Sequence, residues 1–409
     1  MSTTSIGSGS DTLALKVSED AYLGNAQFTV SVDGKQVGGT LTATSLHGSG
    51  QSDTVNVLGD WAAGLHTVTV NFLNDAWGGS TVKDRNLYVD GAAYNGAAVN
   101  GAAAALQASG PRSFALTDPG STFTWSGAAA PQPKANPGDT LNIAAGTFSA
   151  QGGQLSGVTV DLAGSQAAPA GLALQNGSVG KLVLAPMTNN DLGVSKYGKL
   201  TVSGTVTVVG ALQSGGRPAA PGVLAVTLNS GATLNLNGGQ LADGASLVVT
   251  GPAATVTNAG TLSLANTRGF AIHANLSGAG TIQSVPTAAS SGVTIELDGA
   301  VSAGQTIRLN GGTLQLDQPM RFMGTVAGFT TSAPGGPASY LRLQHARATG
   351  TSFQQGANNA GILSVLTQDP ATGAAGTAAI HVAGSFASNA FVFTNDAATQ
   401  SALIRLAPL

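Results

Sequence analysis

The sequence of 409 residues contains no cysteine, which excludes disulfides, cysteine nucleophiles and thiolate-bound metals. Charge is also scarce: only 9% of the residues are charged, and the 16 basic side chains nearly balance the 19 acidic ones. Such a balance predicts no basic face for nucleic acid. Aromatic residues make up only 5%, but hydrophobic residues reach 42%, which is typical of a folded chain and not of charge-driven disorder.

The sequence also lacks a hydrophobic run near the roughly 18 residues of a membrane-spanning helix. Its first ten residues, MSTTSIGSGS, have neither the basic start nor the apolar core of a secretory signal peptide. Taken alone, these absences indicate a cytoplasmic protein. The abundance of Gly, Ala, Ser, Thr and Asn is instead typical of bacterial surface and secreted proteins. We therefore predict an extracellular or cell-surface protein that is exported without an N-terminal signal peptide.

Alternation of apolar and polar residues with a period of two fills the first quarter of the chain. Clear runs occur at 12–17, 26–32 and 66–72, and each predicts a half-buried strand. Asp33-Gly34 follows one of these runs, as in a tight hairpin. Short strands separated by Gly, Asn and Asp predict a jelly-roll-like β-sandwich over residues 7–118.

Residues 119–137 contain four prolines and predict a linker, and a different sequence pattern begins after them. The phrase Gly-x-Thr-Leu-x-(Leu/Ile) occurs at 138–143 and 231–236, and close variants of it recur further along the chain. Returns of such short strands every roughly 20 to 30 residues predict a Gly-rich parallel β-solenoid over 138–317. An open β-sandwich built from the same strands is the alternative. Residues 318–409 are less repetitive and predict a β-rich C-terminal cap for the last rung.

Acidic residues cluster in two loops of the first segment, around residues 18–25 and 74–86. Calcium prefers oxygen ligands, and the Gly-Gly pair of the second loop lets several carbonyls turn toward one point. An aromatic ring beside such an ion would pack on the apolar face of a sugar. Ordinary turns with solvated charges are the other interpretation of the same residues. The candidate oxygen ligands are Glu19, Asp20, Asn74, Asp75, Asp84 and Asn86, and the candidate rings are Tyr22 and Trp77.

The phrases SEDAY, at 18–22, and NDAWGG…DRNLYVDG, at 74–91, together resemble the calcium-dependent xylan-binding carbohydrate-binding modules of family 60 and the related family 36. The resemblance covers about residues 10–117, a quarter of the chain. It implies a small β-sandwich in which a calcium ion binds vicinal hydroxyls of the sugar. The part of the chain that follows looks like the β-solenoid of a bacterial surface protein.

The resemblance also implies a site. Asp75 and Asp84 would be the carboxylate ligands, and carbonyls near Trp77 would complete the shell. For Glu19 and Asp20 two roles stay open, at this ion or at a second, structural one. Asn74 and Asn86 are further candidates for contacts with the ligand. Tyr22 or Trp77 would be the ring that stacks on the sugar.

These features together predict a secreted, non-catalytic protein that binds xylan-like polysaccharide through calcium, with the solenoid as a stalk or adhesin body. Two alternatives stay open: a polysaccharide-degrading solenoid enzyme targeted by the first domain, or a matrix protein that binds the producer's own exopolysaccharide. An enzyme would need clustered acids. In the solenoid only Glu296 and Asp298 are close in sequence. The five histidines show no metal-ligand spacing, so we expect no histidine metal site.

Overall fold

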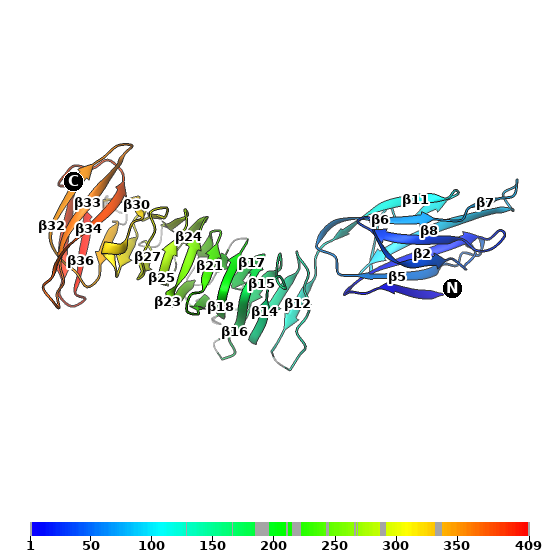
Figure 1. Cartoon of the computed structure of the whole chain (residues 1–409), viewed down its shortest axis with the longest axis horizontal. Helices are drawn as coiled ribbons and strands as arrows, with labels where there is room; N and C mark the ends of the chain where they lie inside the picture. Colours follow the sequence, from blue (N-terminus) through cyan, green and yellow to red (C-terminus); the bar gives the residue numbers. More distant parts are fainter. Residues whose placement is uncertain are drawn as a thin grey trace. The chain divides into compact units, whose positions relative to one another are not determined.

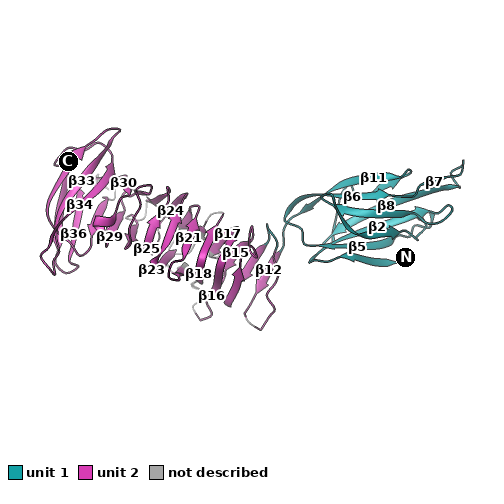
Figure 2. Ribbon diagram, in the orientation of Figure 1, with its two compact units in different colours: residues 1–121, 136–139 teal, residues 122–135, 140–409 magenta. Residues whose placement is uncertain are grey.

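The computed structural model describes residues 2–407 except 128, 166, 185–195, 210–211, 215–221, 243–244, 266, 268, 287–291 and 332–337. Within this part of the chain the protein is all-β, as the sequence predicts, with two single-turn 3-10 helices, η1 (His47–Ser49) and η2 (Pro319–Arg321) (Figure 1). None of the described helices is long and apolar enough to cross a membrane. The chain divides into two compact units, residues 1–121 with 136–139 and residues 122–135 with 140–409 (Figure 2).

The first unit is built from two antiparallel sheets, as expected for a β-sandwich. One sheet has the order β1 (Thr3–Gly7), β5 (Asp53–Gly59), β2 (Asp11–Asp20), β8 (Asp84–Tyr94), β10 (Ala104–Leu106), with β7 (Ala76–Trp77) and β9 (Ala97–Ala98) paired to β8. The other sheet has the order β11 (Gly110–Asp118), β6 (Gly64–Phe72), β3 (Gln27–Val32), β4 (Lys35–Thr42). The edge strand β1 departs from the antiparallel pattern, because it runs parallel to β5.

The apolar core of the first unit comes from the alternation that is visible in its sequence. Leu13, Leu15 and Val17 of β2 are fully buried, and Leu87 and Val89 of β8 are buried beside them. Since neighbouring residues of a strand point to opposite faces, the residues between these positions lie on the other face of the sheet. This parity decides which polar side chains of β2 and β8 come together.

The turn between β3 and β4 confirms the hairpin expected at Asp33-Gly34. Both residues have positive φ angles, 50° and 78°, as a two-residue type I′ turn requires. The Asp33 carboxylate accepts the Thr67 N–H (2.8 Å) and lies 2.7 Å from His66 Nδ1. The other ring nitrogen, Nε2, lies 2.6 Å from the carbonyl oxygen of Ala62. Both ring nitrogens therefore face acceptors, which suits the protonated imidazolium.

The pair of His66 and Asp33 makes stability depend on pH. Burial acts to lower the pKa of His66, but its hydrogen bonds to Asp33 and Ala62 outweigh burial and raise that pKa. The stabilisation is therefore complete below the unfolded pKa of about 6.5 and is lost as the pH rises through the raised folded value. We expect the free energy of unfolding to fall by up to about 1 kcal/mol between about pH 6 and pH 9. Chemical denaturation at both pH values measures this, and His66→Gln should remove the difference.

The second unit consists of two long sheets whose strands alternate along the chain, as in a solenoid (Figure 1). The parallel part of the first sheet is β12 (Thr122–Trp125), β13 (Thr140–Ile143), β15 (Thr159–Leu162), β17 (Lys181–Leu184), β19 (Leu212–Ser214), β22 (Gly239–Ala242), β24 (Thr261–Ala265), β26 (Thr281–Val285), β28 (Thr306–Arg308), β30 (Thr325–Ala327). The parallel part of the second is β14 (Gly146–Gln151), β16 (Ala170–Val179), β18 (Lys196–Val208), β20 (Gly222–Leu228), β21 (Thr233–Leu236), β23 (Ser246–Asn258), β25 (Gly269–Ser277), β27 (Thr294–Leu297), β29 (Thr313–Leu316), β31 (Tyr340–Leu343).

The recurring phrases of the sequence are strands of this solenoid. Those at 138–143 and 231–236 form β13 and β21, and in both the two apolar side chains are buried while Thr and Asn lie at the surface. Stacked rungs share one continuous apolar core that runs the length of the unit. This arrangement confirms the predicted solenoid over the open sandwich.

Parallel pairing extends beyond both ends of the segment 138–317. Thr122–Trp125, within the segment expected to be a linker, pairs in parallel with β13, and its Trp125 packs edge-on against Phe148 at 5.4 Å between ring centroids. At the other end the ladder continues to β31. Five strands then follow, and they pair in antiparallel fashion except that β34 also pairs in parallel with β30: β32 (Arg347–Gln355), β33 (Ala360–Gln368), β34 (Ala375–Ala383), β35 (Phe391–Asp396) and β36 (Ser401–Leu406).

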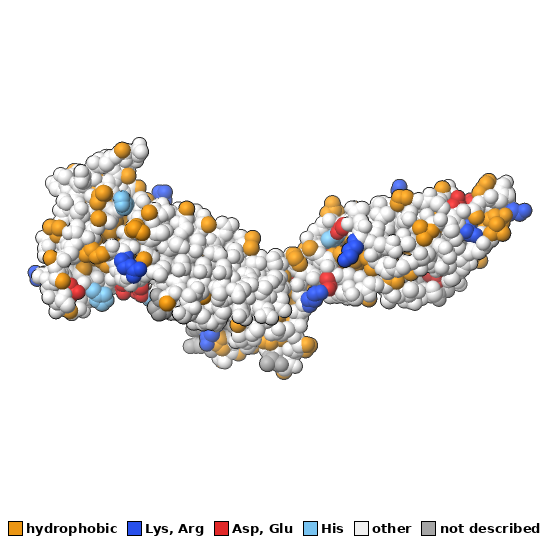
Figure 3. Space-filling model, viewed as in Figure 1, with side chains coloured by type: hydrophobic (Ala, Val, Ile, Leu, Met, Phe, Trp, Pro, Cys, Tyr) orange, Lys and Arg blue, Asp and Glu red, His pale blue; other side chains and the backbone are white. Residues whose placement is uncertain are grey.

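Charge is sparse on the second unit, as the composition predicts. On the face drawn in Figure 3 the middle of the solenoid is almost free of charged side chains, and acids and histidines appear near its C-terminal end. The acids and histidines near the C-terminal end therefore stand out from the otherwise uncharged surface of this unit.

Candidate functional site

The sheet of the first unit that contains β2 and β8 carries a line of polar side chains on its outer face. We call this line the outer row. β2 and β8 are antiparallel neighbours, and Ser18 pairs with Tyr88 and Asp20 with Asn86. Directly paired residues of antiparallel strands point to the same face. The outer row consists of Ser18 and Asp20 from β2 and Asp84, Asn86, Tyr88 and Asp90 from β8.

Two carboxylates of the outer row meet at the buried side chain of Asn86. Its Nδ2 donates to Asp84 Oδ2 (3.0 Å) and to Asp20 Oδ2 (3.3 Å), while its Oδ1 is buried without a hydrogen-bond partner. The Tyr88 hydroxyl also donates to Asp20 Oδ2, at 2.7 Å. Burial, together with this hydrogen bond to Asp20, raises the pKa of Tyr88 to about 12, so the phenol stays a donor at neutral pH. The result is a cluster of oxygen atoms with one unused buried acceptor.

Trp77 lies beside this cluster. β7 pairs with the start of β8 so that Trp77 is opposite Asp84, and the two side chains share a face. The indole is 59% exposed, which is unusual for so large an apolar group in a chain with few aromatics. The half-buried ring of Tyr22 packs against Gly78, the residue that follows Trp77. A Cβ added at Gly78 would lie 2.4 Å from the Tyr22 hydroxyl oxygen. Both predicted rings therefore border the same hairpin.

The predicted ligands Glu19, Asp75 and Asn74 have different surroundings. Glu19 is almost fully buried, and its Oε2 accepts the Ala26 N–H at 2.5 Å. Burial raises the pKa of Glu19, although this hydrogen bond and Arg85 oppose the shift. Because Glu19 lies one residue before Asp20, it points to the core face and away from the outer row.

Asp75 is exposed directly before β7, where its N–H donates to Ser109 Oγ (2.9 Å). Within the described residues, the three carboxylates of Asp20, Asp75 and Asp84 do not all bring an oxygen atom within 4.8 Å of one another. Asn74 uses both polar atoms of its side chain inside the unit: Oδ1 accepts the Gln27 N–H and Nδ2 donates to the Asn25 carbonyl. The structure thus gathers Asp20, Asp84 and Asn86, with Asp75 and Asn74 on the neighbouring loop.

Arg85 holds the two loops in place, a role that the sequence analysis missed. Its guanidinium is buried and donates to the carbonyl oxygens of Tyr22 (2.5 Å), Leu23 (2.6 Å), Gly24 (3.0 Å) and Asn74 (2.5 Å). A planar fork of several donors suits this task better than any other side chain. The sequence does contain a signal: Arg85 stands between Asp84 and Asn86 and has the parity of the buried Leu87.

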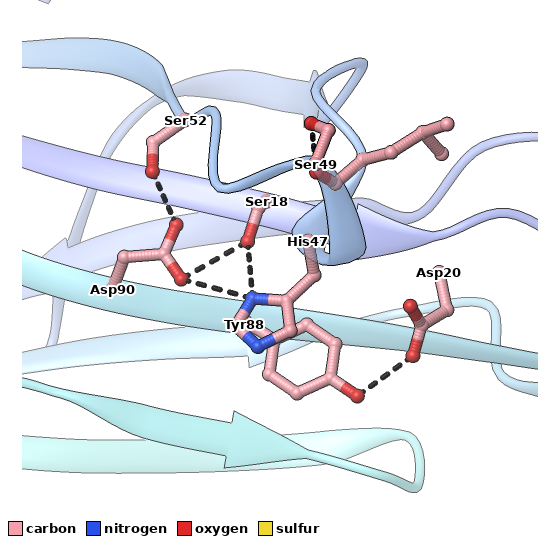
Figure 4. Close-up of polar contacts among 8 residues, drawn as sticks. Ser18, Asp20, His47, Ser49, Ser52, Tyr88 and Asp90 are labelled. Atoms are coloured by element: carbon pink, nitrogen blue, oxygen red, sulfur yellow. Dashed lines mark hydrogen bonds and ion pairs between the residues drawn. The ribbon is translucent and has the colours of Figure 1, made fainter.

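A second aromatic surface, also absent from the sequence analysis, adjoins the cluster. The His47 ring stacks on Tyr88 with 3.7 Å between centroids and 10° between planes (Figure 4). Its Nδ1 lies 2.9 Å from Ser18 Oγ and 3.2 Å from Asp90 Oδ1, and Ser52 Oγ donates to the other oxygen of Asp90 at 2.6 Å. The outer row is thus continuous from Asp90 to Asp84.

The cluster offers ligands of the kind that calcium prefers. Two of its groups are carboxylates, Asp20 and Asp84, and the amide of Asn86 lies between them, with Nδ2 facing both. An exposed ring beside such an ion is typical of a sugar-binding surface. Residues 12–108 match the family model of the Ca-dependent, xylan-binding carbohydrate-binding modules, family 60. This module covers the outer row, Trp77 and both loops, and it confirms the resemblance that the sequence suggested. No curated protein and no solved structure matches the chain.

Proposed function

We propose that the protein is a non-catalytic, extracellular or cell-surface protein that binds xylan-like polysaccharide through calcium, with the solenoid as its stalk or adhesin body. The observation that carries the proposal is the meeting of Asp20, Asp84 and Asn86 beside the exposed Trp77, inside the region that matches a xylan-binding module. A polysaccharide-binding surface is used outside the cell, which supports the proposed location.

The calcium ion would be held by the carboxylates of Asp20 and Asp84 and by Asn86 Oδ1, once the amide turns its oxygen toward them. The family resemblance adds Asp75 and the Trp77 carbonyl from β7. We assign Glu19 to the fold, because its carboxylate is buried and bonded to the backbone. Bound calcium would supply open coordination positions for two vicinal hydroxyls of a sugar.

The ring of Trp77 would supply apolar contact to the sugar. Trp77→Ala is expected to weaken binding of a xylo-oligosaccharide by roughly 1–3 kcal/mol, because the sugar loses its buried aromatic surface. Tyr22→Ala should have a smaller effect, since this ring is half-buried against Gly78 and partly serves the hairpin. Isothermal titration in calcium measures both changes.

Trp61→Ala is the matched control, because Trp61 packs at the edge of the core, 6.1 Å from Tyr94 between ring centroids. Its loss should lower the melting temperature without changing the affinity of the folded protein. Wild-type affinity in both Trp77→Ala and Tyr22→Ala would exclude these rings from the sugar site. Release of reducing ends from xylan by the purified chain would contradict the non-catalytic role.

A further inference from the structure

Three potential metal ligands converge on the outer surface of the solenoid, far along the chain from the calcium cluster. They are His273 on β25, Glu296 on β27 and Asp298 directly after β27, and one ligand atom of each lies within 4.8 Å of the others. Each of the three side chains is partly buried. The rung geometry explains the convergence: Ile272 pairs with Leu297, so His273 comes beside Asp298 on the next rung. His273 Nδ1 and Asp298 Oδ2 are in direct contact.

The next rung adds a third carboxylate. Leu297 pairs with Leu316, which places Asp317 beside Asp298. Both Asp298 Oδ1 and Asp317 Oδ1 are buried and have no hydrogen-bond partner. Burial raises the pKa of Glu296 and of Asp317, and the negative charge of Asp298 raises both further. Crowded anions with unused buried oxygens are stabilised by a bound cation.

The donor set selects the kind of cation. Imidazole nitrogen with carboxylate oxygen suits zinc and similar divalent transition metals, whereas calcium and magnesium prefer oxygen alone. Three protein ligands leave one position of a tetrahedral ion open. Gln315 Nε2 donates to Glu296 Oε1 at 3.1 Å, which fixes one ligand from outside, as supporting residues do in metal sites. Asp317, the neighbour of Asp298, also lines a groove of about 470 Å³.

We propose that His273, Glu296 and Asp298 form a binding site for a divalent transition-metal ion of the zinc type on the solenoid, with Asp317 as an additional anionic neighbour. This site shares no residue with the cluster of Asp20, Asp84 and Asn86, and it does not depend on the proposed glycan binding. Sequence spacing does not reveal this group of residues, because 25 residues separate His273 from Asp298 and no local motif joins them.

Equilibrium dialysis of the full chain against Zn²⁺, with excess Ca²⁺ to fill the first unit, tests the site. Wild type is expected to bind Zn²⁺. His273→Ala and Asp298→Asn are expected to weaken binding at least about 10- to 100-fold, the range found for the supporting residues of metal sites, because each removes a ligand. Zinc should also raise the melting temperature of wild type and not of these variants.

Matched controls come from the same unit: His381→Ala on β34 and Asp396→Asn at the end of β35, both exposed, should bind zinc as wild type does. Glu296→Gln keeps the shape of the side chain and serves if another variant fails to fold. Zinc binding that persists in His273→Ala and Asp298→Asn, or that is absent from wild type, would contradict the metal site. The contact of His273 with Asp298 would then be an ion pair only. Metal-free cleavage of polysaccharide that Glu296→Gln abolishes would overturn the metal site in favour of acid catalysis.

Discussion

Chelation of calcium with EDTA is expected to abolish binding of xylo-oligosaccharide by the full chain, and added calcium should restore it. Asp84→Asn should have nearly the same effect in the presence of calcium, with a loss of at least about 100-fold, or about 2.8 kcal/mol. The reason is that the amide keeps the size of the carboxylate but loses its negative charge and one of its two acceptor oxygens, on which calcium affinity depends. Isothermal titration with and without EDTA measures both effects.

Three further variants separate the ligands from their surroundings. Asp20→Asn should behave like Asp84→Asn, because both carboxylates meet at Asn86. Asp60→Asn, at an exposed position elsewhere in the first unit, should bind like wild type. Asp75→Asn tests the ligand that comes from the family resemblance alone. If Asp75→Asn abolished binding and Asp20→Asn did not, the ion would belong to the β7 loop and not to the outer row.

Strand parity explains how much of the cluster of Asp20, Asp84 and Asn86 was predictable. The sequence named Asp20, Asp84 and Asn86, and the alternation of Leu13, Leu15 and Val17 already indicates that Asp20 and Glu19 face opposite ways. The alternation alone could therefore have assigned Glu19 to the core face and Asp20 to the outer row, but the sequence analysis kept both as candidate ligands. The stacking of His47 on Tyr88 was different, because it depends on how the chain returns after β4, and no periodicity encodes that path.

The solenoid shows the same division. Its strands were predictable because each recurring phrase carries its own alternation, as in Thr140–Ile143, where Leu141 and Ile143 are buried. Which residues become neighbours on adjacent rungs was not predictable, because the loops between the strands vary in length. His273 meets Asp298 only once the register of β25 on β27 is known. Local patterns thus predict the elements of a solenoid, while side-chain clusters on its surface require the register.

Arg85→Ala is expected to cost the first unit about 3–5 kcal/mol of folding free energy, and oligosaccharide binding with it, although Arg85 does not belong to the outer row. Its guanidinium donates to carbonyl oxygens of both loops, and its removal leaves these acceptors and the nearby buried Glu19 without their partner. Denaturation of the full chain should show a lowered first transition, with the transition of the solenoid unchanged.

Arg85→Lys distinguishes the fork from the charge. A lysine keeps the positive charge near Glu19 but cannot reach four carbonyls in one plane, so its stability should recover only in part and its affinity for sugar should stay low. Arg112→Ala, which removes an exposed arginine of β11 in the same unit, is the control and should change neither property. If Arg85→Lys bound sugar like wild type, charge alone would order the loops. The hydrogen bonds from Arg85 to Tyr22, Leu23, Gly24 and Asn74 would then be dispensable for the site.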